Sequence, residues 1–125
     1  MTSYLDTHIV LWLHVSKKDM LSAPAKAALD ESVLLISPIV LLEIQFLMER
    51  GRVTVEGPKI VEDLRETIGL EVCTAAFAAA VEEARKMIWT RDPFDRLIAG
   101  HAAAARAPLI TKDRSIRKHY ERAIW

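Results

Sequence analysis

Short apolar runs bounded by turn residues recur along the chain and alternate with longer stretches of helical spacing. Each short run is almost continuously apolar, as expected for strands that are buried on both faces. The predicted strands are Tyr4–Leu5, Val33–Ile36, Leu70–Cys73, Pro108–Thr111 and Ala123–Ile124.

The stretches between these strands carry helix-start signals, such as a proline in the first turn. Ser37 is the expected N-cap of the third helix, Gly51 follows its end, and 53–55 is a connection that could be extended. Strands that alternate with helices predict an α/β fold in which a parallel sheet is covered on both faces. The predicted helices are 9–15, 24–31, 38–50, 58–68, 74–89, 93–106 and a short one from 114.

Length and composition favour one folded domain over residues 1–125. Hydrophobic residues make up 51% of the 125 positions and charged residues 27%, which excludes a disordered tail. Lys and Arg together number 17, as do Asp and Glu, so the formal net charge is zero. This balance argues against a protein that coats nucleic acid non-specifically, but it allows a local basic rim beside an acidic pocket.

The single cysteine, Cys73, excludes an intrachain disulfide and a zinc site made of thiolates. The beginning of the chain lacks the pattern of a signal peptide, because Asp6 interrupts its short apolar run. No apolar stretch approaches the roughly 20 residues that span a bilayer. We therefore expect a cytoplasmic protein with no membrane partner.

Four acidic residues lie in positions where a folding chain gains little from a charge: Asp6, Glu43, Asp95 and Asp113. Asp6 and Asp113 each follow a predicted strand, Glu43 is two turns into a helix, and Asp95 is in the first turn of another. Ligands of open parallel sheets bind at the carboxyl ends of the strands. Carboxylates gathered there would suit a divalent cation such as Mg²⁺, which can activate water and bridge phosphate oxygens.

Each acid also has a structural interpretation that the sequence leaves open. Asp6 and Asp92 could cap helices, and Asp113 could close a turn with Thr111. Asp95 could complement the positive end of its helix. Glu43 is the hardest to explain structurally, because it shares a helical face with apolar residues; its alternative is a salt bridge to an arginine.

Other chemistry has little support in the sequence. The four histidines lack metal-ligand spacing, and there is no Gly-rich phosphate loop or nucleophile elbow. The aromatic residues fall in helical apolar contexts, and the surface around Leu11, Trp12 and Leu13 could form a partner groove. Arg96 and Arg114 flank the acids and are candidates for contact with a polyanionic substrate. Metal-assisted hydrolysis is the remaining interpretation.

In this order, four segments of the chain resemble the PIN-domain ribonucleases, especially the VapC-type toxins of toxin–antitoxin pairs. The segments are Leu5-Asp6-Thr7-His8, Ser37-Pro38 with Glu43, Asp92-Pro93-Phe94-Asp95-Arg96-Leu97-Ile98-Ala99, and Leu109-Ile110-Thr111-Lys112-Asp113. The resemblance covers essentially the whole chain. It implies a three-layer α/β/α sandwich with a central parallel sheet.

The resemblance also implies Mg²⁺ or Mn²⁺ held by Asp6, Glu43, Asp95 and Asp113, in a pocket that Thr7 and Thr111 support. It implies an RNA substrate, products with a 5′-phosphate and a 3′-hydroxyl, a cognate antitoxin and a homodimer. Some relatives carry a further acid shortly after the last Asp, where this chain has Arg114 and Ser115. That difference puts a second metal ion in doubt.

The sequence therefore predicts a metal-dependent endoribonuclease toxin that a cognate antitoxin neutralises. Two other functions stay open at this point. One is a metal phosphohydrolase that acts on DNA or nucleotides, and the other is a PIN-fold binding module that has lost catalysis.

Overall fold

Five parallel strands form the centre of the molecule, which a computed structural model describes from Met1 to Trp125. Their order across the sheet is β3-β2-β1-β4-β5, and every neighbouring pair is parallel. β1 is therefore central, with Tyr4 aligned between Leu35 of β2 and Leu109 of β4. The strands are β1 (Thr2–Leu5), β2 (Val33–Ile36), β3 (Glu71–Val72), β4 (Leu109–Ile110) and β5 (Ala123–Ile124).

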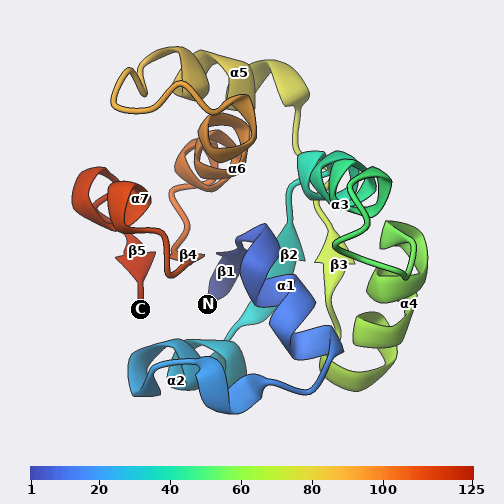
Figure 1. Cartoon of the computed structure of the whole chain (residues 1–125). Coiled ribbons are helices and arrows are strands. Elements are labelled where there is room, and N and C mark those ends of the chain that lie inside the picture. Colours follow the sequence, from blue (N-terminus) through green and yellow to red (C-terminus); the bar gives the residue numbers. More distant parts are fainter.

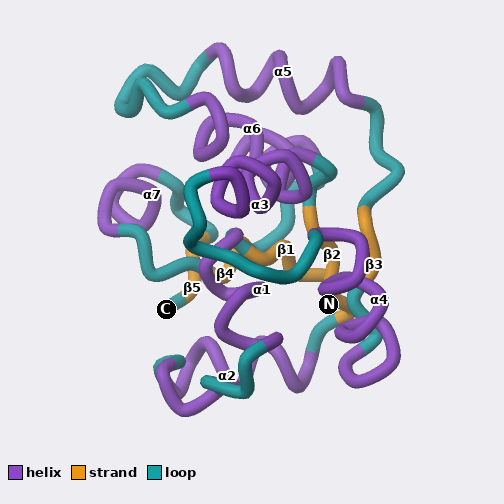
Figure 2. The backbone as a smooth tube through the Cα atoms, turned by 45° about the vertical axis from the view of Figure 1, so that its right-hand side comes forward, coloured by secondary structure: helices purple, strands orange, loops and turns teal.

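Helices connect the strands and cover the sheet on both faces (Figure 1). Figure 2 shows the sheet in the middle, with α1, α2 and α4 on one side and α5 and α6 on the other. α3 contacts both α4 and α6. The helices are α1 (Thr7–His14), α2 (Ala23–Glu31), α3 (Ile39–Glu49), α4 (Gly57–Ile68), α5 (Phe77–Arg85), α6 (Pro93–Ala104) and α7 (Arg114–His119), with a 3₁₀ turn at Lys18–Met20. The predicted three-layer α/β/α sandwich with a parallel sheet is confirmed.

The core is built from apolar side chains of the strands and of the inner helix faces. Leu5, Ile36, Leu109 and Ile110 are completely buried, as expected for central strands with helices on both sides. Burial of one such side chain stabilises the fold by about 1.5–3 kcal/mol. Apolar strand sequences therefore select the layered arrangement.

Close packing of α5 on α6 depends on Gly100. A Cβ atom at this position would lie 2.5 Å from the carbonyl oxygen of Ala80, so any larger residue would force the two helices apart. Gly69 serves a different purpose, because it ends α4 in a left-handed conformation, with φ at 71°. Both glycines are required by backbone geometry.

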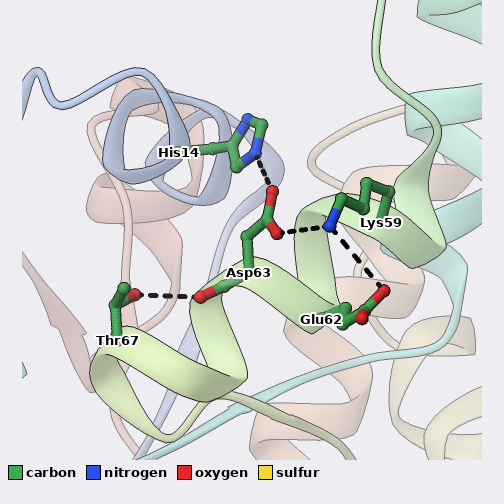
Figure 3. A network of polar contacts seen from close by, with 5 residues as sticks. All are labelled: His14, Lys59, Glu62, Asp63 and Thr67. Atoms are coloured by element: carbon green, nitrogen blue, oxygen red, sulfur yellow. Dashed lines mark hydrogen bonds and ion pairs between the residues drawn. The ribbon is translucent and has the colours of Figure 1, made fainter.

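An ion-pair network joins α1 to α4 on the outer surface (Figure 3). His14 Nε2 lies 2.9 Å from Asp63 Oδ2, and Lys59 Nζ lies 3.0 Å from Asp63 Oδ1. Lys59 also reaches Glu62 at 4.0 Å, and the Thr67 hydroxyl donates to the backbone carbonyl of Asp63 at 3.1 Å. The carboxylate of Asp63 therefore has a basic partner on each side.

Some predicted element bounds were wrong. The helix predicted from 74 to 89 spans only Phe77–Arg85, because the chain first continues the strand direction, with the Cys73 N–H donating to the Ile36 carbonyl at 2.8 Å. The residues 53–55 form no strand. Ser37 is not the N-cap: Pro38 is, although the Ser37 hydroxyl accepts from the Ile39 N–H at 3.3 Å.

The carboxyl edge of the sheet gathers most of the buried polar residues. Asp6 follows β1, Ser37 follows β2 and Thr111 follows β4, and all three are buried. Buried polar groups are costly unless they are hydrogen-bonded, so their concentration at one edge indicates a candidate functional site. In addition, none of the helices has the length and apolarity needed to cross a membrane.

Candidate active site

The site begins where β1 and β4 end side by side. Leu5 pairs with Ile110, so the residues that follow them, Asp6 and Thr111, are neighbours. The Asp6 N–H donates to the Ile110 carbonyl at 3.1 Å, and the Thr111 hydroxyl donates to Asp6 Oδ2 at 2.6 Å. Parallel strand pairing thus fixes the position of this carboxylate.

Asp6 is the most buried acid of the site, with 3% of its surface exposed. Its Oδ1 accepts from the Thr7 N–H at 2.7 Å, so it also is the N-cap of α1. Burial raises the pKa of Asp6, the hydrogen bond from Thr111 lowers it, and the charge of Asp113 raises it again. Capping and membership of an acidic cluster are therefore both features of this residue.

Glu43 reaches the site from the second turn of α3. The Thr7 hydroxyl donates to its Oε1, which links the start of α1 to α3. Burial raises the pKa of Glu43, Thr7 lowers it, and the charges of Asp6 and Asp92 raise it. Glu43 makes no ion pair with an arginine, so the structural alternative considered for it is absent from the structure.

The pKa of Asp95, in the first turn of α6, is affected by every other acid of the site. Burial is the largest cause that raises its pKa, and the charges of Asp92, Asp6, Asp113 and Glu43 add to it. Together they raise the pKa of Asp95 to about 8. One carboxyl group is thus close enough to four others to be affected by each of them.

Asp92 and Asp113 cap helices while they contribute charge to the cluster. Asp92 Oδ1 accepts from the N–H groups of Phe94 and Asp95 at 2.8 and 3.2 Å, as its position before a proline predicts. Asp113 Oδ1 accepts from the Ile116 N–H at 2.8 Å. The Asp113 N–H in turn donates to the Thr111 hydroxyl at 3.0 Å. Thr111 therefore connects two of the predicted acids through one hydroxyl group.

None of these acids has a basic partner. All ion pairs of the molecule are formed by other residues. Buried carboxylates without partners are costly, and like charges at short range favour the protonated forms. Burial and mutual repulsion therefore make the ionised carboxylates unfavourable at this edge of the sheet. Five acids form this acidic cluster: Asp6, Glu43, Asp92, Asp95 and Asp113.

Carboxylate oxygens without competing nitrogen or sulfur donors are the ligands of hard cations. No three of the acidic, histidine or cysteine side chains are grouped closely enough to hold a metal ion by themselves. Mg²⁺, however, usually takes only one or two carboxylates and completes its shell with water and substrate phosphates. The donor set therefore fits a hydrated divalent cation better than a fully enclosed one.

Two residues of this region were assigned no functional role from the sequence. His8, exposed in the first turn of α1, carries a charge that lowers the pKa of both Asp6 and Glu43. Asp92 was interpreted only as a helix cap, yet its charge acts on Glu43 and Asp95. The sequence did hold one signal for both residues: His8 is close to Asp6 in the chain, and Asp92 is close to Asp95.

His101 also was not singled out, although it is buried on α6 and contacts Ser37 directly after β2. Its Nδ1 is 2.6 Å from the Ser37 hydroxyl, and burial lowers the pKa of His101. Ser37 lies two residues before α3, the helix that carries Glu43. The pair thus attaches the beginning of α3 to α6 and helps to place Glu43.

Two hollows flank the acids. One, of about 270 Å³, is lined by His8, Trp12, Lys112 and Asp113. The other, of about 180 Å³, includes Glu43 and Asp92 together with aromatic and basic side chains of α3 and α6. A chain-like substrate that crossed the acids would have room on each side of them.

The two arginines proposed for substrate contact differ in their surroundings. Arg96 Nε donates to the Met87 carbonyl at 2.8 Å and lies in a groove between α5 and α6. Arg114 is exposed at the first position of α7 and makes no side-chain hydrogen bond or ion pair. Neither lines the hollows beside the acids.

Comparison with known sequences agrees with this geometry. The sequence model of the PIN domain matches residues 3–122. Among individual proteins, "Ribonuclease VapC22" of Mycobacterium tuberculosis (strain ATCC 25618 / H37Rv) is 29% identical over 124 residues, covering 94% of this chain and 92% of the relative.

A solved structure has the same fold over the full length of both chains. It is a chain of VapBC2 from Rickettsia felis, described as bound to a DNA fragment from their promoter, with a TM-score of 0.66 and 20% sequence identity. At this identity the likeness concerns the arrangement of helices and strands.

Proposed function

Because this chain belongs to the PIN domain family, we propose that it is a metal-dependent endoribonuclease toxin that a cognate antitoxin neutralises. The observation that carries the proposal is the cluster of five carboxylates at the carboxyl edge of the sheet, none of which has a basic partner. Helix capping accounts for the positions of Asp6, Asp92 and Asp113, but it does not account for Glu43 and Asp95 beside them, where like charges oppose one another. The names of the two relatives, a ribonuclease and a chain of a VapBC complex, support the choice of RNA and of an antitoxin.

The proposed metal ligands are Asp6, Glu43, Asp95 and Asp113. When bound, Mg²⁺ or Mn²⁺ would polarise the scissile phosphate and offset the charge that develops on it. The hydroxyl of Thr111 holds Oδ2 of Asp6 in place, so that this carboxylate keeps one orientation in the absence of substrate. Burial raises the pKa of Asp6, Glu43 and Asp95, and the charges of the neighbouring acids raise it further, so a bound cation would favour the ionised carboxylates.

Glu43 is the proposed acceptor of a proton from the attacking water. Thr7 occupies its Oε1, which leaves Oε2 for the water. Desolvation by burial raises the pKa of Glu43, and a base whose pKa lies nearer to the working pH transfers protons more effectively. Thr7 and Glu43 would together orient the water for in-line displacement at phosphorus, in which the P–O3′ bond breaks and the leaving 3′-oxygen takes up a proton from solvent.

Cleavage of a labelled, structured RNA mixture tests this function. The protein is incubated with Mg²⁺ or Mn²⁺, with EDTA, and as the Asp95→Asn variant; cutting is expected only in the unsubstituted protein with metal. The same metals with DNA and with free nucleotides separate the ribonuclease from other phosphohydrolases. If calorimetry detected no metal binding and no substrate was cut, the chain would be a binding module instead.

The proposed assembly is a cytoplasmic homodimer that also binds the antitoxin. Light scattering after size-exclusion chromatography measures the mass of the chain alone, and the 14.1 kDa chain should give about twice this value as a dimer. A monomer at micromolar concentration would contradict the dimer without affecting the proposed chemistry.

A further inference from the structure

The hollow on the α1 side of the acids contains a cation that pairs with no acid. Lys112 Nζ lies 5.6 Å from the ring centroid of Trp12 and 5.9 Å from that of Trp125. Although Lys112 is next to Asp113 in sequence, it forms no salt bridge. The ammonium group therefore stays available to an anion from outside the chain.

The two indoles bring together parts of the chain that are far apart in sequence. Trp12 is on α1, Trp125 follows β5, and their ring centroids are 6.1 Å apart with planes inclined by 53°. Because the rings are tilted, they do not stack on each other as parallel plates. Both are half-buried; Trp12 lines the hollow, and Trp125 lies against Trp12 without lining it.

Aromatic rings and a basic side chain at the same place are the features by which proteins bind single-stranded nucleic acid. A base can stack on an indole while its phosphate contacts the ammonium group. At about 270 Å³ the hollow is just below the range of about 300–1,000 Å³ for pockets of drug-sized ligands, which suits a single nucleotide unit. Asp113 forms part of its lining, so that a nucleotide bound there would adjoin the acids.

We propose that Trp12, Trp125 and Lys112 form a nucleotide subsite for single-stranded RNA beside the acidic cluster. In this subsite a base stacks on the Trp12 indole in place of the Lys112 ammonium, which moves off the ring to contact a phosphate. The inference rests on the proposed function, because it specifies how the same site would hold its substrate. It also selects unpaired RNA, since the bases of a duplex are stacked inside the helix.

Binding is measured in EDTA and in an Asp95→Asn background, so that no cutting is required. Trp89 is replaced by Phe, because it stacks on His119 outside the hollow and would add unrelated fluorescence. The remaining indoles, Trp12 and Trp125, then report on the subsite. Titration with a mixed-sequence single-stranded RNA of about 12 nucleotides should quench their emission, and the corresponding duplex should not.

Two substitutions separate stacking from charge. Trp12→Leu should raise the Kd for the single strand between about 5-fold and about 100-fold, whereas Trp12→Phe should retain most of the affinity. Lys112→Gln should reduce the slope of log Kd against log salt concentration by about 0.7, the value for one phosphate contact on a single strand. Lys118→Gln, an exposed lysine on α7 outside the hollow, is the control and should leave the slope unchanged.

Equal salt slopes for Lys112→Gln and Lys118→Gln, or equal quenching by duplex and single strand, would overturn the subsite. Because Lys112 is exposed, its variant should fold even if Trp12→Leu, which removes a side chain packed against the core, does not. Cleavage by the unsubstituted protein is scored separately. Cutting without quenching would refute the subsite alone, and quenching without cutting would refute the nuclease alone.

Discussion

The two ends of α1 take part in polar clusters of opposite character. At its beginning, Asp6 and Thr7 belong to the acidic cluster, in which burial and like charges raise the pKa of Asp95 to about 8. At its end, His14 belongs to the ion-pair network with α4, where hydrogen bonds from His14 and Lys59 lower the pKa of Asp63 (Figure 3). The pKa values of two aspartates, Asp95 on α6 and Asp63 on α4, are thus shifted in opposite directions in the clusters at the two ends of α1.

The difference indicates what each cluster contributes. In the α1–α4 network each carboxylate oxygen of Asp63 has a basic partner, so the ionised form is favoured. The resulting ion pairs join two helices at the protein surface. In the acidic cluster the ionised forms oppose one another, and their only partners inside the chain are hydroxyl and backbone donors. Carboxylates held together without cations are a feature that function explains better than stability.

The largest expected contrast is in catalysis. Asp95→Asn should reduce metal-dependent RNA cleavage by about 100-fold or more, the order of magnitude for loss of one group that stabilises the transition state. Asp63→Asn, the same chemical change in the network, should leave the rate of cleavage unchanged. Initial rates on one labelled RNA at saturating Mg²⁺ give the comparison. Full activity of Asp95→Asn would show that the site has been placed wrongly.

Metal binding should stabilise the folded protein through the acidic cluster alone. A ligand at 100 times its Kd adds about 2.7 kcal/mol to the free energy of unfolding. At pH 8, Mg²⁺ or Mn²⁺ should therefore raise the melting temperature of the unsubstituted protein and of Asp63→Asn, and raise that of Asp95→Asn much less. Differential scanning calorimetry with and without EDTA measures this. Equal shifts in all three proteins would indicate metal binding elsewhere.

Without metal, the stability should decrease as the pH rises. The folded chain keeps a proton on Asp95 up to a pKa of about 8, whereas the unfolded chain releases it near the ordinary value of 3.8. Between these values the folded state binds more protons, so the free energy of unfolding falls from about pH 4 to about pH 8. Urea titrations in EDTA should show this decline, and Asp95→Asn should reduce it and be more stable than the unsubstituted protein at pH 8.

The network around Asp63 should make the free energy of unfolding change with pH in the opposite direction. The pKa of Asp63 is lowered in the folded state, so its contribution is present above the unfolded value and is lost as the pH falls through the folded one. Asp63→Asn should therefore lower the stability near neutral pH. If both variants changed the stability in the same direction at pH 8, the electrostatic contrast between the clusters would be refuted.

The smallest expected effects concern the hydroxyl groups. Thr111→Val removes the donor to Asp6 and the acceptor of the Asp113 N–H in a buried place, which should cost about 1–3 kcal/mol. Thr67→Val removes a bond to the Asp63 carbonyl on the exposed surface and should change the stability by less than about 0.5 kcal/mol. Chemical unfolding of both variants tests this, and equal losses would contradict the special role of Thr111.

Local sequence patterns were sufficient for most of the secondary structure. The strands at 33–36 and 123–124 and the helix from Arg114 have the predicted bounds or starts, because apolar runs and turn residues act over a few positions. The segment from 74 to 89 was predicted as one helix because alanine has a high local helix propensity. In the structure its first residues connect β3 to α5, which begins only at Phe77. Parallel strands in alternation with helices then predicted the sandwich correctly.

The four acids could be named from the sequence because Asp6 and Asp113 follow strands, Asp95 lies in the first turn of a helix, and Glu43 lies on an apolar helical face that structure alone explains poorly. What the sequence could not decide was their surroundings. Whether Glu43 had an arginine partner, whether Thr7 and Thr111 faced the acids, and how close Asp92 lay to Asp95 all depend on how α1, α3 and α6 meet at the sheet edge. Long-range contacts of this kind have no local signature.

The sequence by itself thus determined the alternation of elements and the parallel sheet, and it named the candidate acids, because periodicity, capping and residue type act between near neighbours. Only the tertiary structure decided that the acids share one edge without forming ion pairs, that His8 lowers the pKa of Asp6 and Glu43, and that Lys112 contacts two tryptophans from opposite parts of the chain. The physical reason is that pKa shifts and side-chain contacts depend on distance in space. The order of the strands sets that distance, and residues 105 positions apart, Asp6 and Thr111, become hydrogen-bonded neighbours.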